Sequence, residues 1–142
     1  MAESFGSEVR RVLDRLLSDE RAERHRVEGR RQVWKEAVHD FRAVASQSIV
    51  PILQEVLQPL RDRGFRPFIN NNSRLGMTVN LDVDRDDSPG RSLCFRLDAD
   101  QRAVECLVLG PSASRLETPV PLDTVDRGWV EKNVLYFLEQ LS

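Results

Sequence analysis

The chain has 142 residues, 21 of them basic and 23 acidic, with a formal net charge of −2. This length corresponds to one domain, or to one domain with an appendage. Hydrophobic residues make up 40% and charged residues 31%, which is typical of a globular protein in water. Long uncharged apolar runs are absent and charges begin near the first residue, so we expect neither a membrane span nor a secretory signal peptide.

The two halves of the chain differ in charge and pattern. Residues 1–66 carry a net charge of +2 and have helix-forming composition, whereas residues 67–142 carry −4 and contain five of the seven prolines. We therefore expect a helical region over 1–64, used for oligomerisation or folded back on the rest. Residues 65–142 should form an antiparallel sheet with a C-terminal helix. Together with part of the N-terminal helix, this second region should make one cooperative domain.

Apolar side chains recur at helical spacing through most of the first half. Steps of about 3.6 residues from Trp34 define one apolar face: Val38, Phe41, Ala45, Ile49, Ile52, Val56 and Leu60. An earlier segment supplies a second apolar set: Phe5, Val9, Val12, Leu13, Leu16 and Leu17. The pattern is compatible with one continuous helix or with a break near Gly29.

Two prolines and a glycine limit this helical region. Pro51 and Pro59 each lack a backbone donor and should kink the helix or end it nearby. Gly64, which follows two arginines, is a suitable C-terminal stop. A single helix from about residue 4 to 62 would be roughly 90 Å long, far larger than a compact domain of this size. It must therefore project, fold back, or lie against a second copy.

Alternating apolar and polar residues predict a four-stranded antiparallel meander in the second half. The expected strands cover residues 75–83, 93–97, 104–108 and 116–120, with turns at 86–90 and 110–112. Residues 65–69 could add a short strand, which Pro67 would confine to an edge. Cys106 should be a small buried hydrophobic residue, and Cys94 should face the other side of the sheet.

The last segment has the pattern of an amphipathic helix. It should start near Asp123 or Thr124 as N-cap, with Asp126 in the first turn. Its apolar face would include Trp129, Val134 and Phe137. The predicted fold is therefore α+β: a long N-terminal helical region of one kinked helix or two helices, a four-stranded antiparallel meander, and a C-terminal helix on one sheet face.

The polar face of the predicted sheet is a candidate site for a small ligand or a cation. It would carry five polar side chains: Asn80, Asp82, Asp84, Arg96 and Glu105. The acidic run from Asp82 lacks the glycine and the final glutamate of an EF-hand loop. A solvated hairpin mouth is the simpler interpretation of these carboxylates.

An arginine-rich stretch is a candidate interaction surface on the helix. Residues 21–35 carry a local net charge of +4, and Arg24, Arg30 and Arg31 could contact phosphates. Against nucleic-acid binding, no aromatic residue lies among these arginines, and the glutamates at i,i+4 spacing indicate a salt-bridged exposed helix. Trp34 and Phe41 could anchor a protein partner, although packing in the core is the preferred interpretation.

Motifs for common catalytic and cofactor-binding sites are absent. The glycines are isolated, no Cys-x-x-Cys or His-Glu-x-x-His occurs, and His25 and His39 lie too far apart on one helix to share a metal. We therefore predict no catalytic residue, no cofactor and no metal, and the sequence leans against an enzyme. With two cysteines that cannot form a disulfide framework, a reducing cytoplasm is the expected location.

The predicted function is that of a non-catalytic assembly, adaptor or chaperone-like module that acts through protein–protein contacts. The long helical region has more apolar surface than one sheet face can cover, so we expect a homodimer or another oligomer, or a protein partner. The alternatives are a nucleic-acid-associated protein that uses residues 21–35, and small-ligand or cation binding on the polar sheet face. The order helix, meander, helix is shared by small nucleoid-associated proteins and several secretion chaperones, an analogy of order alone.

Overall fold

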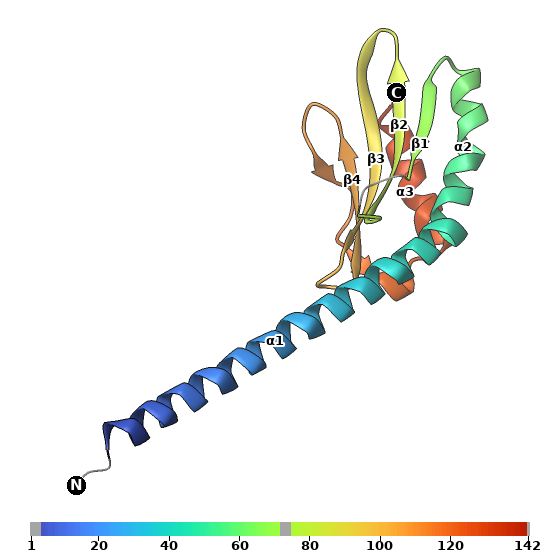
Figure 1. Ribbon diagram of the computed structural model, residues 1–142. Coiled ribbons are helices and arrows are strands. Elements are labelled where there is room, and N and C mark those ends of the chain that lie inside the picture. The colour runs from blue at the N-terminus through green and yellow to red at the C-terminus, as the bar shows by residue number, and fades with distance from the viewer. Residues whose placement is uncertain (1–3, 72–74, 142) are drawn as a thin grey trace. The chain divides into compact units, whose positions relative to one another are not determined.

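The computed structural model describes residues 4–71 and 75–141, with secondary structure in the predicted order (Figure 1). The chain divides into two compact units, Met1–Lys35 and Glu36–Ser142. The fold is α+β, with a long helical N-terminal region, an antiparallel sheet and a C-terminal helix, as predicted from the apolar periodicity.

The N-terminal region is helical from Phe5 to Asp62. It comprises helix α1 (Phe5–Val44), a π-helical turn (Ala45–Ile49) and helix α2 (Val50–Asp62). The helix continues through Gly29, so the predicted alternative of a break there is wrong. The π turn ends at Ile49, two residues before Pro51, which cannot donate a hydrogen bond to the preceding turn. Pro59 lies inside α2 without ending it.

Gly64 ends the helical region in the predicted way. Its φ of +87° is in the left-handed region that favours glycine. The amide of Phe65 donates to the carbonyl of Leu60 at 3.1 Å, and the amide of Gly64 donates to Arg61 at 3.0 Å. These two bonds form a Schellman motif, which satisfies the last carbonyls of α2.

The sheet is antiparallel, with strand order β1-β2-β3-β4-β5 and with β6 also paired to β4. The strands are β1 (Arg66–Asn70), β2 (Thr78–Arg85), β3 (Ser88–Asp98), β4 (Ala103–Leu109), β5 (Ser114–Arg115) and β6 (Val120–Pro121). The edge position predicted for a strand containing Pro67 is confirmed. The predicted fourth strand over 116–120 is wrong in detail, because two short strands, β5 and β6, pair with β4 instead, and Val120 is the one residue of the predicted range that belongs to either of them. Pro119 and Pro121 lack the amide that a continuous strand would need.

Helix α3 (Arg127–Glu139) starts later than predicted. Residues Leu122–Thr124 form a 3₁₀ turn, and Asp126, not Asp123 or Thr124, is the N-cap. The Asp126 carboxylate accepts a hydrogen bond from the amide of Trp129 at 2.8 Å. Leu122 and Val125 are buried in this connection, so the segment docks on the core before the helix begins.

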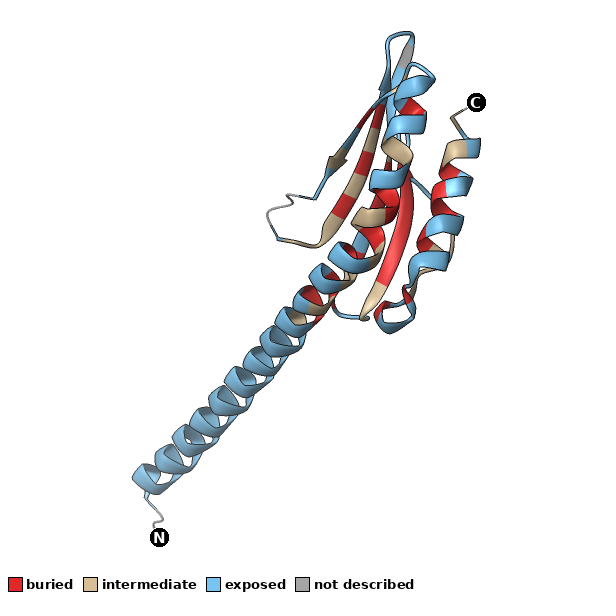
Figure 2. Ribbon diagram, turned by 90° about the vertical axis from the view of Figure 1, so that its right-hand side faces the viewer, coloured by how far each residue is buried: buried red, intermediate tan, exposed pale blue. Residues whose placement is uncertain are grey.

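Helices α2 and α3 lie over one face of the sheet, and the core fills the space between these helices and the sheet (Figures 1 and 2). This helix-covered face consists of alternate residues from the three long strands, all buried: Val79, Leu81, Val83, Leu93, Phe95, Leu97, Val104, Cys106 and Val108. The Phe95 and Trp129 rings meet edge to face, with centroids 5.7 Å apart. The helical region adds Phe41, Ile49 and Leu53, each no more than 1% exposed.

Candidate functional site

The opposite face of the sheet brings several of the predicted polar residues together. Arg96 on β3 lies directly across from Glu105 on β4, and Asp82 on β2 lies across from Ser92 on β3. Asn80 is paired with Cys94, between these two polar pairs. The solvated hairpin mouth predicted for the acidic run agrees with the exposure of residues 84–87, whereas Cys94, Glu105 and Leu107 further along this face are all less than a tenth exposed. We call this surface the second sheet face.

Glu105 is the centre of the only extensive ion-pair cluster on the described part of the second sheet face. Its carboxylate accepts hydrogen bonds from the Arg96 guanidinium on β3 and from Arg115 Nη2 on β5, the latter at 3.0 Å. The Glu105 side chain is 11% exposed, while both arginines are about half exposed. Two cations therefore neutralise one buried carboxylate and join three neighbouring strands. No pattern in the sequence indicated Arg115, which lies in a segment that reads as a loop.

The three remaining polar-face residues have separate environments. Asp82 accepts a hydrogen bond from the Ser92 hydroxyl at 2.6 Å. The side-chain oxygen of Asn80 is buried without a hydrogen-bond partner among the described residues. Asp84 is exposed near the hairpin end, against Gly90. Over residues 4–71 and 75–141, no group of three or more His, Cys, Asp or Glu side chains is arranged to hold a metal ion.

Removing the Glu105 carboxylate should lower stability. We expect Glu105→Gln to reduce the free energy of unfolding by about 1–2 kcal/mol, because Arg96 and Arg115 lose the negative charge and one of the two acceptor oxygens that they share, while solvent partly compensates them. Glu131→Gln is the matched control, since Glu131 is an exposed residue of α3. Urea unfolding followed by circular dichroism measures both variants. Equal effects of the two substitutions would contradict a stabilising role for the Glu105 cluster.

Both cysteines are free thiols buried in the sheet, on opposite faces of adjacent strands. Burial raises the pKa of Cys94, and it raises the pKa of Cys106 from 9.0 to about 12. The thiolate is the reactive form of cysteine, so neither residue has the properties of a catalytic nucleophile.

We expect neither thiol to react with a disulfide reagent in the folded protein at about pH 8. The folded state holds the Cys106 proton more tightly than the unfolded chain does, so stability should fall as the pH rises from 9.0 towards about 12. Thiol titration with and without denaturant checks the first expectation, and alkaline unfolding curves check the second. Rapid reaction of either thiol in the folded protein would contradict the first expectation, and stability that does not change between pH 9.0 and about 12 would contradict the second.

The predicted interaction residues on the helical region have different exposures. Arg24, Arg30 and Arg31 are exposed on α1, and Trp34 is half-buried. The ion pair in this stretch joins Glu23 and Arg26 at 2.8 Å. Phe41 is 1% exposed, so it packs in the core, which agrees with the packing interpretation and makes it unsuitable as an anchor for a partner.

Six apolar residues near the start of α1 are exposed (Figure 2). They are Phe5, Val9, Val12, Leu13, Leu16 and Leu17, which we call the N-terminal stripe, and their exposed fractions range from 38% to 82%. All other described residues of the Met1–Lys35 unit are exposed too, except the half-buried Trp34. An apolar stripe without cover within its own unit is the feature of this unit that best indicates an interaction site.

In comparisons with known proteins, no protein-family model, no curated protein and no solved structure matches this chain. No helix over the described residues is long and apolar enough to cross a membrane.

Proposed function

We propose that this chain is a non-catalytic assembly or adaptor module of the cytoplasm, and that it self-associates through the N-terminal stripe. The observation that carries the proposal is the exposure of six apolar side chains on one short stretch of helix. Most helices in proteins are stabilised by packing of their apolar face, and residues 4–35, the described part of the Met1–Lys35 unit, contain no second element that could cover this one.

The spacing of the stripe favours another helix as its partner. Phe5, Val9, Val12 and Leu16 follow one another at intervals of four, three and four residues, which is the spacing of the buried positions in a coiled coil. We call these four residues the seam. Leu13 lies beside the seam and widens its apolar surface. A second helix with the same spacing would cover the stripe along its whole length.

A second copy in antiparallel orientation fits this seam. Phe5 would lie across from Leu16 of the other copy and Val9 across from its Val12, so the layers are apolar throughout and the arrangement is two-fold symmetric. Glu8 would then lie near the Arg15 of the other copy, which gives a favourable charge pair on each side. Such an interface would be self-complementary in its apolar layers and in its charges.

The parallel orientation is less favourable because the seam becomes charged beyond residue 17. Continuing the same spacing leads to Asp19, Glu23, Arg26 and Arg30, and in a parallel, in-register pair each would face its own equivalent. Four successive like-charge layers would oppose that arrangement. In the antiparallel pair these residues lie outside the overlapping segment.

Light scattering coupled to gel filtration of the full chain, over a wide concentration range, tests self-association. We expect the average mass to rise with concentration from that of one chain, 16.3 kDa, towards twice that value, because a seam of four layers is short. A mass of one chain at every concentration would refute the proposal.

A distance measurement tests the orientation separately. A spin label attached at His25→Cys would lie roughly 40 Å or more from its equivalent along an antiparallel pair centred between Val9 and Val12, but close to it in a parallel pair. The buried native cysteines allow selective labelling at the new site. Short distances in a confirmed dimer would overturn the antiparallel arrangement.

A further inference from the structure

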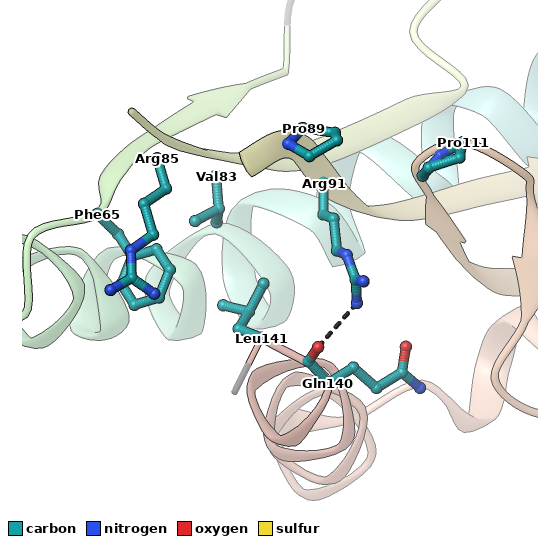
Figure 3. Close-up of a pocket in the computed structure, with 8 residues that line it drawn as sticks. All are labelled: Phe65, Val83, Arg85, Pro89, Arg91, Pro111, Gln140 and Leu141. Atoms are coloured by element: carbon teal, nitrogen blue, oxygen red, sulfur yellow. Dashed lines mark hydrogen bonds between the residues drawn. The ribbon is translucent and has the colours of Figure 1, made fainter. Parts of the chain in front are cut away.

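Two adjoining hollows lie at one end of the Glu36–Ser142 unit, where the C-terminal ends of α2 and α3 approach the β2–β3 hairpin. Their volumes are about 400 Å³ and 230 Å³, and they share three lining residues, Phe65, Arg85 and Leu141. Figure 3 shows the residues that line the smaller hollow. Neither hollow belongs to the second sheet face or to the N-terminal stripe. The larger hollow alone reaches the lower part of the size range of small-molecule sites.

The larger hollow has an apolar wall made by the two helices. Val56, Pro59 and Leu60 come from α2, and Leu138 comes from α3. Leu141, two residues after the end of α3, extends this wall and also lines the smaller hollow. An aliphatic chain would meet apolar groups along this wall.

The smaller hollow has cationic side chains where the alternation of the sheet would place apolar ones. Along β2, Val79, Leu81 and Val83 face the core, and Arg85 follows at the next alternate position, after an irregularity in the strand register. On β3 the cross-strand partner of Val83 is Arg91, which lies two residues before the core residue Leu93 and therefore on the same sheet face. Two arginines therefore replace apolar residues at one end of the helix-covered face, which is a departure from the pattern of a purely structural sheet.

These arginines have no carboxylate partner among the residues that the structure describes. Arg85 lies over the Phe65 ring, with its guanidinium carbon 5.0 Å from the ring centroid. Arg91 Nη1 donates to the backbone carbonyl of Gln140 at 2.7 Å. Arg63, on the rim of the larger hollow, likewise has no described ion pair. By contrast, Arg96, Arg102, Arg115 and Arg127 all pair with acidic side chains.

We propose that the two hollows form one binding site for a linear aliphatic monocarboxylate of medium chain length. The aliphatic chain would lie along the α2–α3 wall, and the carboxylate would accept hydrogen bonds from Arg85, which lines both hollows. Arginine binds carboxylates through two parallel hydrogen bonds, and the contact with Phe65 holds its guanidinium plane in place. Arg91 and Arg63 add positive charge on either side.

Titration calorimetry with decanoate, kept below its micelle-forming concentration, tests the site on the full chain. Decanol has the same alkyl chain without the charge, and acetate has the carboxylate without the chain. We expect decanoate to bind, decanol to bind at least about tenfold more weakly, and acetate not to bind measurably. Absence of decanoate binding, or equal affinity for decanol, would overturn the proposal.

Two matched substitutions identify the residue that holds the carboxylate. Arg85→Gln should weaken decanoate binding about tenfold or more and leave decanol binding unchanged. Arg61→Gln removes an exposed arginine of α2 outside both hollows and should change neither. Equal losses in the two variants would indicate a general effect of net charge and would contradict the assignment.

Methyl NMR locates the bound molecule independently of its affinity. Decanoate should shift the Leu138 and Leu141 methyl resonances and leave those of Val9, Val12 and Leu16 unchanged. Shifts confined to the N-terminal stripe would place the ligand on the wrong unit and refute the site. Because the two hollows and the N-terminal stripe share no residue, self-association and carboxylate binding are tested independently of each other.

Discussion

Substituting Leu16 with aspartate is expected to abolish the proposed self-association and to leave a monomer at every accessible concentration. Leu16 is 53% exposed and lies at the end of the seam that begins at Phe5. In the antiparallel pair the substitution would bury a carboxylate against Phe5 of the other copy, twice per dimer. An unpaired buried charge costs several kcal/mol, more than an interface of four layers can supply. Sedimentation equilibrium measures the loss.

The matched control for this prediction is Ser18→Asp. It adds the same charge two residues further along α1, at an exposed position outside the seam. The Ser18→Asp protein should self-associate as the parent protein does. Both variants should keep the helical circular-dichroism signal of the folded Glu36–Ser142 unit. If Leu16→Asp still associates as the parent does, the N-terminal stripe is not the interface.

Replacing Phe95 with alanine will have the largest effect on stability. Phe95 is fully buried at the middle of β3, across from Val79 and Cys106, and its ring contacts Trp129 of α3. The substitution leaves a cavity between the sheet and α3, and such Phe→Ala changes cost about 3–5 kcal/mol. That is a large part of the 5–15 kcal/mol typical of a folded domain. Denaturant unfolding followed by tryptophan fluorescence measures the change.

Phe68→Ala is the corresponding control, because Phe68 is on the edge strand β1 and is 63% exposed. It should cost no more than about 1 kcal/mol. Should the Phe95→Ala protein fail to fold, Phe95→Leu, with a smaller cavity, should still fold and lose less stability. Similar losses for Phe95→Ala and Phe68→Ala would contradict the position of the core.

Local patterns were sufficient to predict most of the fold. Strict alternation identified β2, β3 and β4, and Gly64 identified the end of α2, because each signal depends on neighbouring residues alone. The start of α3 was predicted too early because Asp123, Thr124 and Asp126 are all suitable caps. Burial of Leu122 and Val125 decides between them, and burial is a property of the tertiary structure.

The candidate sites were predicted less completely, for a related reason. Arg96 and Glu105 could be assigned to one sheet face by parity, but the second cation, Arg115, comes from a two-residue strand with no pattern of its own. The arginines of the two hollows were not predicted either. Arg85 follows a register irregularity, and its position beside Phe65 and Leu141 depends on three elements that are distant in sequence.

The borders of the sheet have a consequence for the behaviour of the protein in concentrated solution. One border is β1, five residues long, in which Pro67 offers no amide for pairing; at the other, β5 and β6 have two residues each. Open-ended stacking of sheets into fibrils needs a long, regular strand with free donors and acceptors. Such growth has no suitable starting strand among those described, so assembly of this protein should stop at small, closed species.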